Sequence, residues 1–318
     1  VDAGDLDQAA SASREALSIL EEAFGERNRN TIQGMRNLAR VLERKGDIRG
    51  SAALLARAIE HDRHPRHLSY LGFQEFLLGN PSVAEELYRE MVAAYAKRVP
   101  LDSLRMMGEM VLFPWLFLSE GRVDEADSLL RGLQAYWEAR PAGFASEMRL
   151  GQVYRGMASL RIAQDMPFEA GEFARRSEDL YQRLAPDITR RVGDHVATRL
   201  VGLSMAARAE ALLLQGDAAR AERLAERADS LVSSATGDHH WRSAEVRSIL
   251  GEALVDRGRY DQATSLLTSS YRTLHESLSD KSPITRRARQ RLIHFYEAQD
   301  RAVPDSLLVE SDTGGSDR

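Results

Sequence analysis

The sequence has no cysteine, which excludes disulfides, thiolate catalysis and cysteine-ligated metal sites. Lysine is almost missing too: Lys45, Lys97 and Lys281 are the only lysines, and the other basic residues among the 43 are arginine. Acidic residues outnumber basic ones, 48 to 43, so the net charge is -5 at pH 7. A nucleic-acid-binding protein needs a basic excess, and we therefore expect no nucleic-acid partner.

Long apolar runs are also lacking. The longest, Val111–Leu118, has eight residues and contains Pro114, whereas roughly 20 apolar residues are needed to span a bilayer. We expect no direct membrane insertion by this chain and a cytoplasmic location. There is no glycine-rich phosphate loop, nucleophile elbow, zinc-binding H-E-x-x-H or calcium loop. The sequence therefore predicts no enzymatic activity, no cofactor and no metal.

What the sequence does contain is a recurring turn signal, in most copies a glycine. The turns are expected at Gly4, Gly46, Gly79, Gly121, Asp165, Gly216, Gly258 and, more weakly, Asp300, with separations of 33 to 51 residues and most often 42. A small residue such as Ser51, Ala84 or Ala263 follows at a constant offset. Because glycine accepts the left-handed conformation that ends a helix, each signal predicts two helices joined by a tight turn.

Apolar residues at helical spacing between the turns predict the helices themselves. The pairs expected are 30–45 with 47–60, 65–78 with 82–98, 101–120 with 123–139, 143–164 with 168–184, 190–215 with 217–235, and 240–257 with 261–278. A helix over 5–24 has no first partner, which together with the start at Val1 predicts a piece of a longer polypeptide. A last helix over 283–299 is expected to cap the array, with Arg286, Arg287, Arg289 and Arg291 facing solvent.

The best copy combines a Leu-Gly pair at Leu250 and Gly251, small residues at Ala253 and Ala263, and the turn Gly258-Arg259-Tyr260. These residues resemble the tetratricopeptide repeat, and the 42-residue copies resemble the longer kinesin-light-chain variety of it. That variety joins its repeats by a Gly-x-x-His-Pro-x-Thr linker. Parts of this linker stand at Gly25 and Thr31, at Gly237 and His240, and at Pro283 and Thr285.

The resemblance implies an all-α fold, a right-handed superhelical solenoid of about seven antiparallel helix hairpins. The array is expected to cover residues 1–308, with an incomplete first repeat and the capping helix 283–299. Residues 309–318 form a polar, acidic tail that we expect to be disordered. The resemblance also implies that the first helix of each pair lines a concave inner wall and the second helix lies outside.

The predicted inner wall carries the candidate binding residues. They are Arg36, Arg40, Arg66, Phe73, Phe76, Trp115 and Arg155, with Glu252 and Asp256 toward the far end. Arginine binds carboxylates bidentately and aromatic side chains dominate interaction hot spots, so these positions suit a protein or peptide with acidic residues and an apolar anchor. Alternatively, the aromatic residues complete the core and the arginines are solvated.

Two further segments allow more than one interpretation. His61, His64 and His67 have the spacing of metal ligands on one helix face, but Pro65 interrupts that helix, and we favour an ordinary linker between repeats. The apolar stretch that includes Met106 and Val111–Leu118 is expected to be a core helix rather than a ligand cover, with a kink at Pro114.

We therefore expect a non-enzymatic protein–protein interaction scaffold that binds a peptide or protein partner in its concave groove. The alternative is the carboxyl-terminal sensor or docking region of a larger bacterial serine/threonine protein kinase, because repeat arrays of this type resemble such regions. In a membrane-anchored kinase the array would lie outside the cytoplasm.

Overall fold

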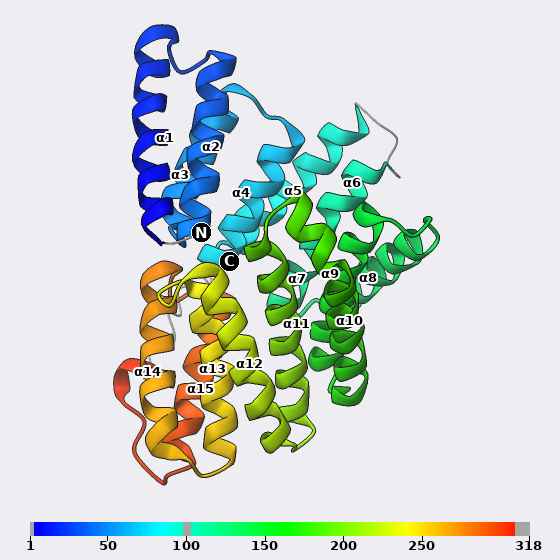
Figure 1. The fold of residues 1–318 in the computed structure, drawn as a ribbon, viewed down its shortest axis with the longest axis vertical. Coiled ribbons are helices and arrows are strands. Elements are labelled where there is room, and N and C mark those ends of the chain that lie inside the picture. The colour runs from blue at the N-terminus through cyan, green and yellow to red at the C-terminus, as the bar shows by residue number, and fades with distance from the viewer. Residues whose placement is uncertain (1–2, 98–102, 309–318) are drawn as a thin grey trace, which may run out of the picture.

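Antiparallel helix hairpins follow one another along the chain in the computed structural model, which describes residues 3–97 and 103–308 (Figure 1). No strand occurs within these ranges. The inner helices and their outer partners are α2 (Arg29–Lys45) with α3 (Ile48–His61), α4 (Pro65–Leu78) with α5 (Pro81–Ala96), α9 (Phe144–Ala163) with α10 (Pro167–Arg191), α11 (Asp194–Leu214) with α12 (Ala218–Thr236), and α13 (Trp241–Asp256) with α14 (Tyr260–Ser277). In the remaining pair α6 (Leu104–Glu109), the 3-10 turn η1 (Met110–Leu112) and α7 (Phe113–Ser119) precede α8 (Val123–Glu138). Helix α1 (Ala3–Phe24) precedes these pairs, and α15 (Pro283–Glu297) and α16 (Asp305–Leu308) follow them.

This order of helices confirms the expected all-α solenoid. The expected acidic tail, 309–318, lies outside the described residues.

The turns between paired helices have the predicted backbone conformation. The glycines at five of them, Gly46, Gly79, Gly121, Gly216 and Gly258, have φ between 70° and 87°. The turns that lack glycine are occupied by Asp165 and Asp300, whose φ angles are 57° and 52°. In the described part of the chain no other residue except glycine has a positive φ. The turn expected at Gly4 is wrong, because α1 begins at Ala3 and Gly4 lies in its first turn.

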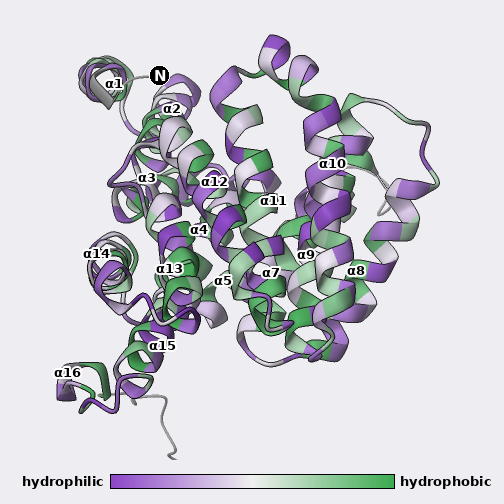
Figure 2. Ribbon diagram, turned by 60° about the horizontal axis from the view of Figure 1, so that its bottom comes forward, coloured by the Kyte–Doolittle hydropathy of each residue, from purple (hydrophilic) through white to green (hydrophobic). Residues whose placement is uncertain are grey.

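In the pairs α4–α5, α11–α12 and α13–α14 the first helix is the more deeply packed one. In α13, Ile249, Leu250 and the run from Ala253 to Val255 are all buried, whereas α14 buries a single stripe made of Ala263, Leu267, Ser270 and Leu274. Figure 2 shows hydrophobic residues gathered where α5, α7, α9 and α13 lie, and hydrophilic residues along outward parts of α8 and α10. The inner helices are therefore packed between neighbours, and most of their apolar surface is buried because the repeats stack.

The predicted helix 101–120 is broken rather than continuous. It divides into α6, η1 and α7, and Pro114 lies in the first turn of α7, where its missing N–H breaks no helical hydrogen bond. The expected disturbance near Pro114 is confirmed as a break. In contrast, α10 continues through Pro186 to Arg191, beyond its predicted end. None of the described helices combines the length and the apolar character needed to cross a membrane.

The capping helix α15 differs from the prediction in one respect. Arg291 is only 7% exposed, and its Nε lies 2.7 Å from Oε2 of Glu252 on α13, while Nη2 lies 2.5 Å from Oε1 of Glu210 on α11. The expectation of a solvent-facing Arg291 is therefore wrong. The arginine faces inward because two carboxylates on neighbouring inner helices are there to pair with it.

The two ends of the array contact one another. The Oγ of Ser279, in the turn before α15, donates a hydrogen bond of 2.5 Å to the carbonyl of Leu78 at the end of α4. Nη2 of Arg44 on α2 lies 3.2 Å from Nε2 of His195 on α11. In Figure 1 α2–α5 lie next to α13–α15, and these helices share one buried apolar cluster, with α6–α12 forming the connection at the side. The solenoid thus closes on itself, which the sequence did not predict.

Candidate functional site

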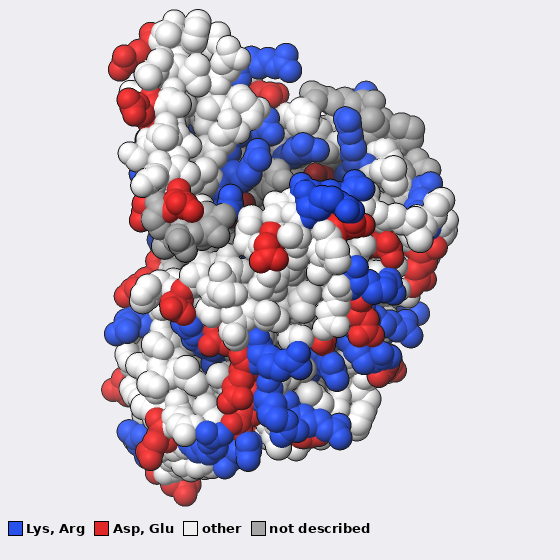
Figure 3. All heavy atoms as spheres, viewed as in Figure 1, with Lys and Arg blue, Asp and Glu red and all other residues white. Residues whose placement is uncertain are grey.

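The closed array has a hollow with a basic lining. Figure 3 shows a depression between the half that contains α2–α5 and the helices beside it, with Lys and Arg atoms around much of its rim. Several arginines stand on the inner helices: Arg36 and Arg40 on α2, Arg66 on α4, Arg155 on α9, Arg199 on α11 and Arg242 on α13. Since the whole chain is acidic, this concentration of positive charge on one surface is a local property.

One group of neighbouring arginines on α2 and α4 contains three of the predicted residues, Arg36, Arg40 and Arg66. Burial and the positive charges of Arg66 and Arg40 lower the pKa of Arg36. The Nη1 of Arg36 donates a hydrogen bond of 2.9 Å to Oε1 of Gln33, and Nε of Arg66 lies 3.9 Å from Oε1 of Glu109. Arg36 and Arg40 form no ion pair with any described carboxylate, so both can still bind an anion.

A second group of charged residues that act on one another, which we call the inner basic cluster, consists of Arg44, Arg155, Arg199 and Arg242, together with Glu43. Burial and the charge of Arg199 lower the pKa of Arg242 to about 9, and Glu43 opposes this shift. Burial likewise lowers the pKa of Arg199, and Arg155 and Arg44 add to the effect. These guanidiniums therefore repel one another in a poorly hydrated place, and the nearby carboxylates Glu43 and Glu245 offset this only in part.

The aromatic candidates do not all belong to this surface. Trp115 is half-buried, with the guanidinium carbon of Arg155 5.7 Å from its ring centroid. Phe73 is also half-buried and packs on the core. Phe76 is only 8% exposed and belongs to that core, so its placement in the groove is wrong. The sequence pattern could not separate the two phenylalanines, because both lie on the inner helix of one repeat.

At the far end, the expected acidic residue Glu252 is already used inside the protein, since it pairs with Arg291. Asp256 lies one helical turn further along α13 and is exposed. We therefore restrict the candidate surface to the arginines, Trp115 and Phe73.

The histidines between repeats have structural contacts. The Nδ1 of His64 accepts a hydrogen bond of 3.2 Å from the N–H of Arg66 and caps α4, and His240 caps α13 in the same way at 3.0 Å. The Nδ1 of His67 lies 3.1 Å from the carbonyl of Asp62. Over the ranges that the structure describes, no three His, Asp or Glu side chains are arranged to hold a metal ion.

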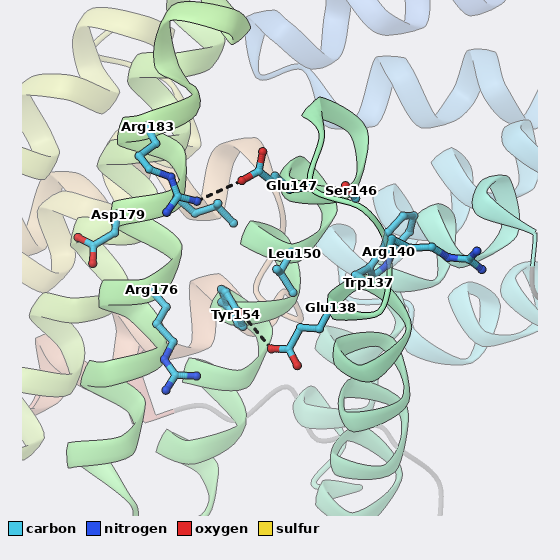
Figure 4. A pocket seen from close by; sticks show the side chains of 12 residues that line it. Trp137, Glu138, Arg140, Ser146, Glu147, Leu150, Tyr154, Arg176, Asp179 and Arg183 are labelled. Atoms are coloured by element: carbon cyan, nitrogen blue, oxygen red, sulfur yellow. Dashed lines mark hydrogen bonds and ion pairs between the residues drawn. The ribbon is translucent and has the colours of Figure 1, made fainter.

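A separate pocket of about 370 Å³ lies between α8, α9 and α10 (Figure 4). The Tyr154 hydroxyl donates a hydrogen bond of 3.0 Å to Oε1 of Glu138 across it, and Nη2 of Arg183 lies 3.1 Å from Oε1 of Glu147. Figure 4 shows these two pairs bridging the walls, whereas Arg140 points away. Three carboxylates of this pocket are already engaged, Glu138 and Glu147 across it and Asp179 with Arg175, so its acidic groups are not available to a ligand.

Sequence reasoning missed Arg199 and Arg242. One signal was available for these two: Arg199 and Arg242 both stand in the first two turns of an inner helix, α11 and α13. The repeat pattern is weakest in the middle of the chain, so the common position of these arginines within their helices became clear only from the helix boundaries.

The geometry defines an all-helical repeat protein with a basic inner surface, and comparisons of the sequence agree with this class. Two family models described as tetratricopeptide repeat match the chain, one over residues 1–64 and the other over 202–227 and 244–267. The chain therefore contains tetratricopeptide repeats, as the sequence predicted. No curated protein sequence matches it.

Solved structures similar to the chain include a putative kinesin light chain with nearly identical TPR-like repeats from Podosopora anserina. It is 18% identical, with a TM-score of 0.44 over 67% of this chain and 98% of that chain. BtubC (BKLC) from P. vanneervenii is 17% identical, with a TM-score of 0.45 over 71% of this chain and 84% of that chain.

Proposed function

We propose that this protein is a non-enzymatic interaction scaffold that binds an acidic segment of a partner protein on its inner wall. The observation that carries the proposal is the set of guanidiniums without an ion-pair partner on two inner helices, Arg36 and Arg40 on α2 and Arg155 on α9, inside a chain of net negative charge. Guanidinium groups bind carboxylates through paired hydrogen bonds, and a recessed surface strengthens each bond by excluding water.

Trp115 and Phe73 supply the apolar part of the proposed surface. Both are half-buried, so each ring is held by the core while part of it stays accessible. A ring that is already ordered loses little conformational entropy on binding, which is why such residues dominate interface energies. The segment that fits this surface has acidic residues for the arginines and one apolar side chain for the rings.

The test uses immobilised decapeptide libraries with three fixed Asp or Glu residues and random positions between them. We expect retention of the wild-type protein on these libraries and not on matched Asn or Gln libraries. The double variant Arg36→Glu/Arg40→Glu should lose most of its retention on the acidic libraries. The retention of Trp115→Ala should fall several-fold. Each lost charge-assisted hydrogen bond is worth about 1.5–3 kcal/mol.

The matched control is Arg223→Glu/Arg227→Glu, which makes the same charge change at exposed positions on the outer helix α12. Retention of this control at the wild-type level, with loss in the inner-wall variant, supports the groove. Equal loss in both variants would mean that only net charge matters, and the proposed inner-wall site would be abandoned.

Attachment to a bacterial serine/threonine kinase remains an alternative with its own test. We infer it from the resemblance alone. The coding sequence of the intact gene would contain a glycine-rich loop and an H-R-D motif before these repeats if the alternative holds.

A further inference from the structure

The inner basic cluster exists because the array closes. Arg155, Arg199 and Arg242 come from α9, α11 and α13, whereas Glu43 and Arg44 come from the end of α2, far away in the sequence. The closure contacts hold these helices together: Arg44 lies 3.2 Å from His195, and a Cβ at Gly46 would lie 3.3 Å from Cδ2 of His240. An open row of the same repeats would leave α2 distant from α13.

The three arginines from α9, α11 and α13 differ from other recessed arginines of this protein. Arg161 pairs with Asp127 and with Glu169, whose Oε2 lies 2.9 Å from its Nε, and Arg291 pairs with Glu210 and Glu252. No described carboxylate lies within ion-pair distance of Arg155, Arg199 or Arg242, and the buried Nε of Arg155 has no hydrogen-bond partner. Leaving a recessed charge unpaired is unfavourable, so this is a place where an external anion would stabilise the fold.

The neighbouring groups leave the positive charge uncompensated. His240 is 5% exposed and accepts a hydrogen bond from the N–H of Arg242, and burial holds its pKa at about 3, so it is neutral at pH 7. Burial and the nearby Arg44 also lower the pKa of His195. Two carboxylates act on the four guanidiniums: Glu43, and Glu245 on α13, which also pairs with Arg287. The cluster therefore has a surplus of positive charge that one further carboxylate would not neutralise.

We propose that the inner basic cluster is a binding site for a phosphorylated side chain of a partner segment that lies along the inner wall. A phosphate monoester has close to two negative charges at pH 7 and three acceptor oxygens, so it can accept hydrogen bonds from two or three guanidiniums at once. The proposal rests on the inner wall being a partner surface and adds phosphorylation as the condition for tight binding.

The test compares three immobilised libraries of random decapeptides that differ in one fixed central residue: phosphoserine, glutamate or serine. We expect the wild-type protein to bind the phosphoserine library at least roughly tenfold better than either of the others, which corresponds to one or two charge-assisted hydrogen bonds. Inorganic phosphate at millimolar concentration should compete. Equal binding to the phosphoserine and glutamate libraries would overturn the phosphate site and leave the acidic-segment proposal in place.

The variants are Arg199→Gln/Arg242→Gln and, as the control, Arg223→Gln/Arg227→Gln on α12. The first should lose the preference for phosphoserine while its melting temperature stays the same or rises, because it removes mutual repulsion. The control should keep the preference. Retained preference in the cluster variant would overturn the proposal.

A second measurement does not depend on any variant of the cluster. The guanidinium carbon of Arg242 lies 4.2 Å from the ring centroid of Trp241, so an anion on Arg242 should change the emission of this tryptophan. In a variant with Trp115 and Trp137 replaced by Phe, Trp241 is the one remaining tryptophan. Soluble peptides of the phosphoserine library should shift its emission, and soluble peptides of the serine library should not. Inorganic phosphate at the concentration that competes should shift the emission as well, and no shift at saturating phosphopeptide would contradict the proposed site.

Discussion

Asp165 and Asp300 hold the left-handed conformation that glycine adopts at the other turns, with φ of 57° and 52°. For a residue with a Cβ this conformation is unfavourable by roughly 1–2 kcal/mol, although aspartate tolerates it better than most residues do. The Asp165 side chain is exposed and makes no hydrogen bond with the described residues. The rest of the hairpin therefore imposes this conformation on Asp165.

Replacing Asp165 with Gly should therefore stabilise the protein. We expect the midpoint of urea unfolding to rise by an amount equivalent to about 0.5–1 kcal/mol, because glycine adopts this φ without strain. Gly258→Ala is the opposite change at a turn with φ of 70° and no atom within 4 Å of the added Cβ, and it should lower the midpoint. A lower midpoint for Asp165→Gly would show that the aspartate has a favourable contact of its own.

Two buried histidines make stability depend on pH. Burial lowers the pKa of His240 to about 3 and that of His67 to about 4, and both side chains are nearly inaccessible. In the unfolded chain each histidine binds a proton near pH 6.5, so the unfolded state takes up more protons than the folded state below that pH. Their stabilising contribution is complete above pH 6.5 and declines as the pH falls toward the folded values.

His240→Asn should reduce this dependence. Asparagine cannot titrate and still offers an oxygen to cap α13, so the cap itself is preserved. Between pH 7 and pH 5 we expect the wild-type protein to lose about 2 kcal/mol more of its free energy of unfolding than the variant does, measured by urea titration at both values. Identical slopes would mean that His240 is protonated in the folded protein.

Glycines inside helices set the distance between the two helices of a hairpin. A Cβ at Gly151 on α9 would lie 2.5 Å from Cζ of Tyr181 on α10, and one at Gly251 on α13 would lie 2.6 Å from Cγ of Leu267 on α14. The Tyr181 ring is buried, and its hydroxyl donates a hydrogen bond of 3.1 Å to the carbonyl of Met148. The ring cannot withdraw from Gly151 without losing this bond.

Gly151→Ala should therefore destabilise the α9–α10 hairpin. We expect a loss of about 1–3 kcal/mol, as for other substitutions that overfill a packed core. Gly132→Ala on α8 is the matched change with no atom within 4 Å, and it should gain about 0.5–1 kcal/mol from helix propensity. Thermal unfolding followed by circular dichroism distinguishes the two, and a gain in both would contradict the packing argument.

At the scale of the whole molecule, closure depends on a close approach between Gly79 and Lys281. Gly79 has φ of 84°, and a Cβ there would overlap the backbone of Lys281, which stands near the start of α15. The Leu78 carbonyl beside it accepts the hydrogen bond from Ser279. The first repeats and the last ones are thus held together through backbone contacts.

Gly79→Ala should open the array. Gly258→Ala adds the same methyl group at a turn of similar φ with free space around it, so the difference between the two variants reports the closure contact alone. We expect a larger radius of gyration by small-angle X-ray scattering for Gly79→Ala only, together with loss of the phosphoserine preference. An unchanged radius of gyration would mean that the two ends adjust to the added methyl group and stay in contact.

The hairpins could be predicted from the sequence because each depends on neighbouring residues: a glycine that ends one helix, a small residue five positions later, and apolar residues at helical spacing. The inner basic cluster could not. Its members Glu43 and Arg242 are brought together by the summed rotation of all the repeats between them, and no local pattern encodes that sum. For the same reason Phe76 and Phe73 looked equivalent, and Arg291 looked solvated.

Closure also constrains how this protein can evolve. In an open solenoid one repeat more or less lengthens or shortens the structure and changes little else. Here an extra hairpin between α5 and α11 would rotate Ser279 away from Leu78 and carry Arg44 past His195. Duplication and deletion of whole repeats, the ordinary route by which such genes diversify, should therefore be selected against in this lineage, and homologues should keep the same number of hairpins between these contacts even where their sequences have diverged.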